Sequence, residues 1–299
     1  MDEPGTIARK SQTPTRFEEV KRVGSPPPFR DVLCAVDGSR GSEEAIRQGI
    51  ALDGPGTRLS FVAVCEDRGV GLAAQADLGE HRARSALDEA SALARKGGGH
   101  PSTSMLSGAS VSDLLLAEAA DHDLLVVGCH GGSWLGGVML GSTATQIAHR
   151  AEGPVLVARR TADGDDFPQR VLLATDGSPG SWAAARTATC IAEARQSELR
   201  LVYVPGGMSP ARYREVLKQL TVIEKATGYQ PRVVDKPGQV AERITGSAQA
   251  AQSSLIVIGR RGVKGLRALG SVSERVVHRA PCSVLLVPPG MSRSSRPNG

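Results

Sequence analysis

The sequence predicts an α/β protein built from two tandem doubly wound sheets, each of five parallel strands with helices on both faces. Three observations predict it: short apolar runs alternate with longer amphipathic stretches, the same series of segments occurs twice, and 299 residues suffice for about two domains. Runs such as 124–127 (LLVV) are typical of strands buried on both faces. The alternation therefore favours parallel sheets covered by helices.

The series of segments occurs twice in one order. Residues 32–39, VLCAVDGS, return as 171–178, VLLATDGS, and the strand-like run 124–128 returns as 255–259. The other matching pairs are Gly141-Ser142 with Gly270-Ser271, and the last strands at 155–157 and 284–287. Two copies of one fold, each of ordinary domain size, follow from this order.

The repeat divides the chain into five parts. Residues 1–30 lack an apolar period and are rich in Pro, Ser and Thr, so we expect a flexible leader there. Domain 1 is expected at 31–160, a linker at 161–168, domain 2 at 169–288 and a polar tail at 289–299.

Amphipathic stretches and capping signals place the helices. In domain 1 the apolar spacing predicts helices over 42–52, 78–96, 111–121 and 146–151. Helix starts are indicated by Ser110 with Asp113 three residues on, by Ser181, and by Ser271 with Glu274 in the capping-box position. Pro154 and Pro281 precede the last strand of each copy, where a proline ends a helix.

Composition excludes several classes of protein. No run approaches the about 18 uncharged apolar residues of a membrane-spanning helix, and the first residues lack the pattern of a secretory signal. Five cysteines without a C-x-x-C pair argue against a disulfide framework or zinc knuckle, so the chain is expected to be cytoplasmic. The net charge is +5, but basic residues are scattered and aromatics make up only 3%, so nucleic acid is not an expected partner.

Glycines after the fourth strand of domain 1 indicate an anion site. Gly128-Cys129-His130-Gly131 is followed, nine residues on, by Gly141-Ser142-Thr143 at the start of a helix. Ligands of doubly wound sheets lie at this edge. Glycines let backbone N–H groups approach an anion and allow positive φ, and the helix start adds hydroxyls and positive potential. We interpret the segment as a phosphate cradle.

Asp37 ends the first strand, at the same edge of the sheet. A carboxylate repels phosphates, so its expected ligand partner is a sugar hydroxyl or a base amino group. Alternatively, Asp37-Gly38-Ser39 is only a strand-to-helix turn with an Asx cap. The residues favour neither alternative.

The sequence resembles the universal stress protein family in two motifs: Val-Asp-Gly-Ser after the first strand and G-x2-G-x9-G-S after the fourth. The resemblance covers roughly residues 30–288, so the chain looks like a tandem two-domain member. The resemblance implies that the last strands of the two halves pair, with further self-association of chains, and that the protein binds ATP, with or without Mg²⁺, in a stress-response regulatory role. The positions that it implies as nucleotide contacts are Asp37 and Val64 at the base and ribose, and Gly128, Gly131, Gly141, Ser142 and Thr143 at the ribose and phosphates.

Domain 2 departs from this pattern. Gly259-Arg260-Arg261-Gly262 is followed by only seven residues before Gly270-Ser271, which shortens the loop that must wrap the phosphates. However, the region has four basic residues, which either bind an anion or form a solvated basic turn: Arg260, Arg261, Lys264 and Arg267. The matching base-end positions are Asp176 and Val204. We therefore expect binding mainly through domain 1.

Other motifs are weak or absent. The segment 69–74, GVGLAA, resembles a dinucleotide-binding fingerprint but opens no first βαβ unit, and a connector is the better interpretation. P-loop, G-x-S-x-G and H-E-x-x-H motifs do not occur, and no metal site is expected. No second acidic residue stands by the phosphates, so we expect a nucleotide-binding protein without catalytic residues. Two alternatives stay open: an ATP-hydrolysing switch with slow turnover, and a ligand-free interaction protein.

Overall fold

The computed structural model describes residues 29–54, 56–66, 73–129, 140–204, 210–227, 232–233, 239–260 and 269–290. The predicted leader and polar tail lie almost entirely outside these ranges, as does most of the GVGLAA segment. Among the described residues, none of the helices is both long and apolar enough to cross a membrane.

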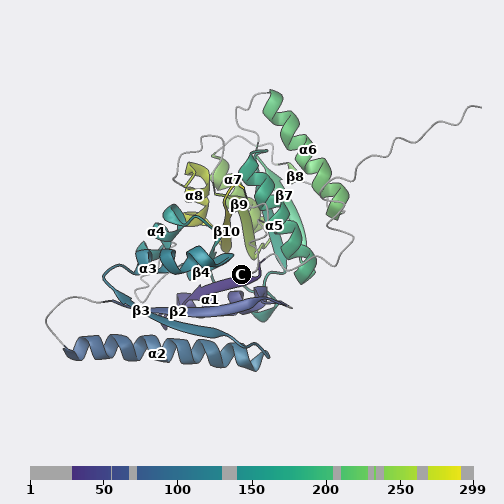
Figure 1. Ribbon diagram of the computed structural model, residues 1–299. Coiled ribbons are helices and arrows are strands. Elements are labelled where there is room, and N and C mark those ends of the chain that lie inside the picture. Colours follow the sequence, from purple (N-terminus) through teal and green to yellow (C-terminus); the bar gives the residue numbers. More distant parts are fainter. Residues whose placement is uncertain are drawn as a thin grey trace, which may run out of the picture.

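Each half contains the predicted alternation of strands and helices (Figure 1). Domain 1 consists of β1 (Asp31–Ala35), α1 (Arg40–Leu52), β2 (Arg58–Glu66), α2 (Ala73–Lys96), β3 (Ser102–Gly108), α3 (Val111–Glu118), a 3-10 turn (Ala119–Asp121), β4 (Leu124–Gly128), α4 (Ser142–Arg150) and β5 (Val155–Ala158). Domain 2 consists of β6 (Arg170–Thr175), α5 (Pro179–Arg195), β7 (Glu198–Tyr203), α6 (Pro210–Thr227), β8 (Arg232–Val233), α7 (Val240–Ala250), β9 (Leu255–Gly259), α8 (Ser271–Arg279) and β10 (Ser283–Val287). A second 3-10 turn, Gly164–Asp166, lies in the predicted linker.

The strands of the two halves form one continuous sheet. Its order is β3-β2-β1-β4-β5-β10-β9-β6-β7-β8, and all neighbours run parallel except β5 and β10, which are antiparallel. Leu156 stands opposite Leu285 at this junction. The predicted five-stranded parallel sheets are confirmed, and their last strands pair as the family resemblance implied.

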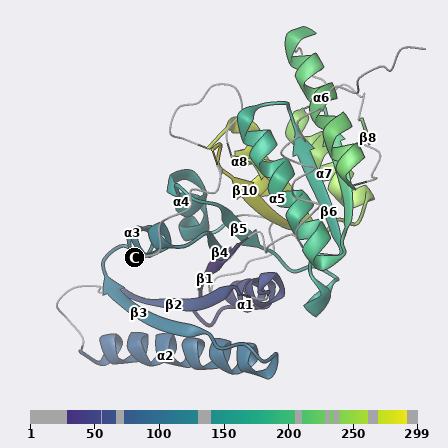
Figure 2. The same ribbon diagram turned by 45° about the vertical axis from the view of Figure 1, so that its right-hand side comes forward.

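Helices cover both faces of the sheet, as a doubly wound fold requires (Figures 1 and 2). Buried residues of α1, α2, α5 and α6 share one apolar cluster, and those of α3, α4, α7 and α8 share the other. Each cluster extends across β5 and β10. The two halves are therefore fused through a common core on both faces, and α2 and α6 lie at its far ends (Figure 2).

One predicted helix start, Ser181, and one predicted cap, Ser271, are wrong. The N-cap of α5 is Ser178, whose Oγ accepts from the Ser181 N–H at 3.2 Å, and Pro179 follows it in the first turn. Ser271 is the first residue of α8, as the helix start predicted, but the N-cap is Gly270, which has no side chain to form a capping box. The Ser110 cap of α3 is confirmed, since its side chain accepts from the Asp113 N–H at 3.3 Å.

Candidate functional site

The carboxyl edge of domain 1 brings most of the predicted site residues together. Ala35 stands opposite Val62 on β2, so two steps further along the same register Asp37 is level with Val64. Cys34 stands opposite Val126 on β4, which brings Asp37 level with Cys129 in the same way. The described candidates are Asp37, Val64, Gly128, Gly141, Ser142 and Thr143, whereas Gly131 lies outside the described residues.

The turn after β1 has the Asx geometry that the sequence left open. The Ser39 N–H donates to Asp37 Oδ1 at 2.9 Å, Gly38 takes a positive φ of 74°, and Ser39 caps α1. The Asp37 side chain nevertheless stays exposed. Capping and a ligand contact are therefore compatible at this residue, because a carboxylate has a second oxygen.

Gly128 is required by packing rather than by positive φ. A Cβ on Gly128 would lie 2.4 Å from the carbonyl carbon of Gly41, in the first turn of α1. Gly259 has the same relation to Gly180 in α5, at 2.8 Å. Neither glycine has positive φ, and Gly141 has a φ of −63°. The prediction of positive φ is therefore wrong for Gly128, Gly141 and Gly259. Close contact between a strand end and a helix explains Gly128 and Gly259 instead.

The loop after β4 is closed at its base by the backbone. The Gly141 N–H donates to the Cys129 carbonyl at 2.8 Å, and the Cys129 N–H donates to Ala158 at 3.0 Å. Domain 2 repeats this closure, because the Gly270 N–H donates to Arg260 at 3.0 Å. The shorter loop of domain 2 thus starts and ends at equivalent positions. The predicted residues His130, Gly131, Arg261, Gly262, Lys264 and Arg267 all lie in the undescribed parts of the two loops.

The start of α4 is open to an anion. Its N-cap, Gly141, makes no side-chain capping bond, whereas Ser39 and Ser110 cap α1 and α3. Ser142 is exposed, and Thr143 is half-buried beside it. Within the part of the chain that the structure describes, the N–H groups of this first turn therefore lack the side-chain acceptor that the other two helices have. Helix starts of this kind bind phosphates and carboxylates.

Polar contacts on the outer face hold α4 in place. Arg150 pairs with Asp113 of α3 at 2.5 Å, and the Ser112 hydroxyl donates to Gln146 Oε1 at 2.7 Å. Domain 2 has an equivalent pair, Arg279 with Glu242 of α7 at 3.2 Å. The helix that carries the candidate phosphate site is thus fixed to its neighbour in both halves.

The corresponding turn of domain 2 is covered. A Cβ on Gly177 would lie 2.9 Å from Val216 Cγ2 and 3.1 Å from the Val216 nitrogen, so α6 packs directly on the turn. On the same side, fully buried Gln219 accepts hydrogen bonds from the hydroxyls of Thr175 and, at 3.3 Å, Ser181. In domain 1, among the described residues, a Cβ on Gly38 would meet only Ala86, at 3.9 Å.

The other candidates of domain 2 are also less accessible. Val204 and Gly259 are buried, whereas Val64 and Gly128 are half-buried, and Asp176 is half-buried whereas Asp37 is exposed. Gly270 and Ser271 match Gly141 and Ser142 in exposure. Arg260, 1% exposed, stands where domain 1 has the much smaller Cys129. The predicted base-end positions of domain 2 are therefore less exposed than those of domain 1.

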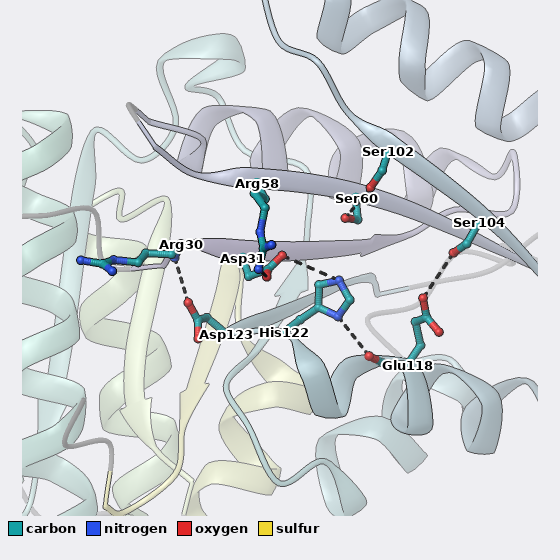
Figure 3. Close-up of polar contacts among 9 residues, drawn as sticks. All are labelled: Arg30, Asp31, Arg58, Ser60, Ser102, Ser104, Glu118, His122 and Asp123. Carbon is teal, nitrogen blue, oxygen red and sulfur yellow. Dashed lines mark hydrogen bonds and ion pairs between the residues drawn. The ribbon is translucent and has the colours of Figure 1, made fainter. Parts of the chain in front are cut away.

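The amino edge of domain 1 holds a second polar cluster, which ties strand starts together (Figure 3). Asp31 of β1 pairs with Arg58 of β2, and His122 Nε2 lies 3.8 Å from Asp31 Oδ1. His122 Nδ1 lies 3.0 Å from the Glu118 carbonyl. The cluster lies at the opposite end of the strands from Asp37. Among the described residues, no group of three His, Cys, Asp or Glu side chains is placed to hold a metal ion.

Comparison with known proteins identifies relatives along most of the chain. The sequence profile of the universal stress protein family matches residues 28–159 and 168–288. A universal stress protein of Mycolicibacterium smegmatis is 31% identical over 288 residues, which cover 86% of this chain and 97% of the relative. The crystal structure of a universal stress protein from Archaeoglobus fulgidus aligns with a TM-score of 0.72 at 19% identity, over 87% of this chain and 99% of that one. A universal stress protein structure from Pseudomonas aeruginosa aligns with a TM-score of 0.68 at 18% identity, over 87% of this chain and 94% of that one.

Proposed function

The chain belongs to the universal stress protein family, and from this premise we propose that it binds an adenine nucleotide, ATP in the first instance, at the carboxyl edge of domain 1, and that the bound state regulates its interactions in a stress response. The proposal rests on one observation above all. The uncapped start of α4 lies at the same sheet edge as the exposed Asp37 turn. N–H groups that can donate to a phosphate and a carboxylate that can accept from a hydroxyl are therefore available to one ligand at this edge.

Each described candidate has a role in this proposal. The N–H groups of the first turn of α4 and the Ser142 hydroxyl receive the phosphates. Asp37, whose Oδ1 accepts from Ser39, offers its second oxygen to a ribose hydroxyl or a base amino group. Val64 lies level with Asp37 and gives the base an apolar contact. The nucleotide's own phosphates would carry any Mg²⁺ into the site.

The proposal assigns binding mainly to domain 1. Asp37 and Gly38 are exposed there, while α6 covers Gly177 in domain 2 and Arg260 fills the position of Cys129. A ligand at domain 2 would have to displace packed side chains, which costs affinity. This packing difference supports binding mainly through domain 1, independently of the shorter loop of domain 2.

A pair of matched variants tests the proposal. In Asp37→Asn the amide oxygen still accepts from Ser39, so the start of α1 is kept while the carboxylate charge is lost. Loss of a hydrogen bond to a charged group corresponds to about 1.5–3 kcal/mol, so ATP affinity by calorimetry should fall at least about tenfold. Asp176→Asn, the matched change in domain 2, should leave affinity and stoichiometry unchanged.

Other results would replace the proposal. Equal losses in both variants would contradict the assignment to domain 1. No heat of binding, no nucleotide released on denaturing the purified chain and no rise of the melting temperature with millimolar ATP would favour a ligand-free interaction protein, because a ligand of the native state must stabilise it. Phosphate release that falls with Asp37→Asn would favour the slow ATP-hydrolysing switch over a binding protein.

A further inference from the structure

A buried polar network crosses the junction between the two halves. The Gln48 side chain of α1 donates from Nε2 to the Arg159 carbonyl at 2.7 Å, and Arg159 directly follows β5. Ser283 of β10 accepts from the Arg159 N–H at 2.9 Å and donates from Oγ to Gln48 Oε1 at 2.8 Å. These bonds hold the Arg159 backbone from both halves at once.

The Arg159 side chain is buried without a carboxylate partner in the part of the chain that the structure describes. The residue is 6% exposed, and Nη2 donates to the Val277 carbonyl in the last turn of α8 at 2.6 Å. This contact compensates the charge only in part, because the C-terminal end of a helix carries about half an elementary charge. Nε makes no hydrogen bond to any described residue.

Among the described residues, the groups that interact electrostatically with the guanidinium are two neutral thiols. Its electrostatic neighbours are the thiols of Cys129 and Cys282. Burial raises the pKa of Cys282 to about 12, and burial also raises that of Cys129. Both thiols therefore keep their protons at neutral pH and offer no negative charge. Burial in turn lowers the pKa of Arg159, as expected for a cation that lacks a counter-ion.

Arg159 is adjacent to the base of the candidate phosphate loop. One step beyond the β4–β5 register it stands opposite Cys129, whose carbonyl accepts the Gly141 N–H at 2.8 Å. Neighbouring strands are about 4.8 Å apart, so the Arg159 backbone lies roughly one strand spacing from the residue that closes this loop. The guanidinium also interacts electrostatically with the Cys129 thiol. The equivalent position in domain 2 is Pro288, which has no charge.

We propose that Arg159 is the residue that makes the site of domain 1 selective for phosphorylated over unphosphorylated nucleosides, by supplying a fixed buried charge behind the phosphate loop. This inference rests on the proposed function. A buried cation is costly unless an anion compensates it, and a phosphate group at the start of α4 would be that anion. A unit charge acting over about 10 Å at an effective dielectric constant of about 20 changes affinity by roughly tenfold.

The test compares two ligands, ATP and adenosine, on the full chain. Arg159→Gln removes the charge but keeps an N–H donor for the Val277 carbonyl, and Arg159→Lys keeps the charge. Calorimetry should show ATP affinity falling about tenfold in Arg159→Gln and adenosine affinity changing less than about twofold, while Arg159→Lys keeps most of the ATP affinity. Arg159→Met gives the same comparison if the glutamine variant does not fold.

Gln48→Leu is the matched control, because it breaks the junction network without changing charge. Melting temperatures of all variants, measured without ligand, show whether each chain is folded. Parallel losses for ATP and adenosine in Arg159→Gln, or a selectivity loss in Gln48→Leu as large as that in Arg159→Gln, would overturn the inference and leave Arg159 as a cap of α8. A wild-type chain that binds neither ligand would overturn the proposed function first, so the two failures are distinguishable.

Discussion

Single residues set how closely the helices approach the sheet. Gly128 and Gly259 end equivalent strands, and each faces the backbone of a helix start, at Gly41 and Gly180. Gly49, inside α1, also allows a close approach, because a Cβ there would lie 2.2 Å from Cys34 Sγ of β1. The close contact at Gly128 brings the start of α1, which follows the Asp37 turn, against the end of β4. The spacing of the candidate site therefore depends on glycines that need not touch a ligand.

Gly128→Ala should lower stability by about 1–3 kcal/mol, because a methyl group at 2.4 Å from the Gly41 carbonyl carbon forces the backbone of α1 to move. The measurement is urea unfolding of the variant and the wild type. Gly153→Ala is the control, since a Cβ there meets nothing within 4 Å. A Gly128→Ala chain as stable as Gly153→Ala would mean that α1 and β4 have room to separate.

At the scale of elements, helix starts divide into capped and uncapped ones. Ser39, Ser110 and Ser178 cap α1, α3 and α5 with their side chains, whereas glycine stands at the N-cap of α4 and α8. The capped starts stabilise the fold, and under the proposed function the uncapped start of α4 offers its N–H groups to the phosphates.

The sequence predicted the order of elements well because buried parallel strands and amphipathic helices have strong local patterns. It located the start of α4 through Gly141-Ser142-Thr143, although the amphipathic pattern alone began only at 146. It failed to identify the cap of α8, because a glycine N-cap has no side-chain signature. The sequence also predicted Ser181 as the start of α5, whereas the N-cap is Ser178. Pro179 indicated the correct start, because proline is common in the first turn of a helix.

Contacts between distant residues were beyond the reach of local patterns. Gln48 and Ser283 are 235 positions apart, and nothing in either segment indicates that their side chains meet. The packing of α6 on Gly177 is likewise a tertiary contact. Sequence could place the candidate site at the carboxyl edge of domain 1, but the difference in accessibility between the two halves required the structure.

Ser178→Ala should destabilise the chain by about 1–2 kcal/mol, because it removes the only side-chain acceptor that caps α5 within the described residues, and Ser178 is 1% exposed. Ser271→Ala should change stability by less than about 0.5 kcal/mol, since Ser271 is exposed and caps nothing. Thermal and urea unfolding of the two variants give the comparison. Equal effects would restore Ser271 as a capping residue and contradict the assignment of Gly270.

At the scale of the whole molecule, the two halves share a sheet and two cores. The apolar clusters on each face run through β5 and β10 without a break, and the Gln48–Arg159–Ser283 network closes the junction at one end. His149 of α4 also lies 3.4 Å from Glu274 of α8, on the outer face of the junction. Domains joined by a core of this kind lose stability together rather than separately.

Ser283→Ala tests this cooperativity. The change leaves the Gln48 Oε1 and the Arg159 N–H buried without their partner, which lowers stability by about 1–3 kcal/mol. Ser283 belongs to domain 2 and the other two groups to domain 1, so the loss affects the junction between them. Differential scanning calorimetry should show one transition, shifted to lower temperature, with equal calorimetric and van't Hoff enthalpies. Ser283→Thr keeps a hydroxyl and should restore part of the shift. Separation into two transitions would contradict this expectation and show that the junction joins two units that unfold independently.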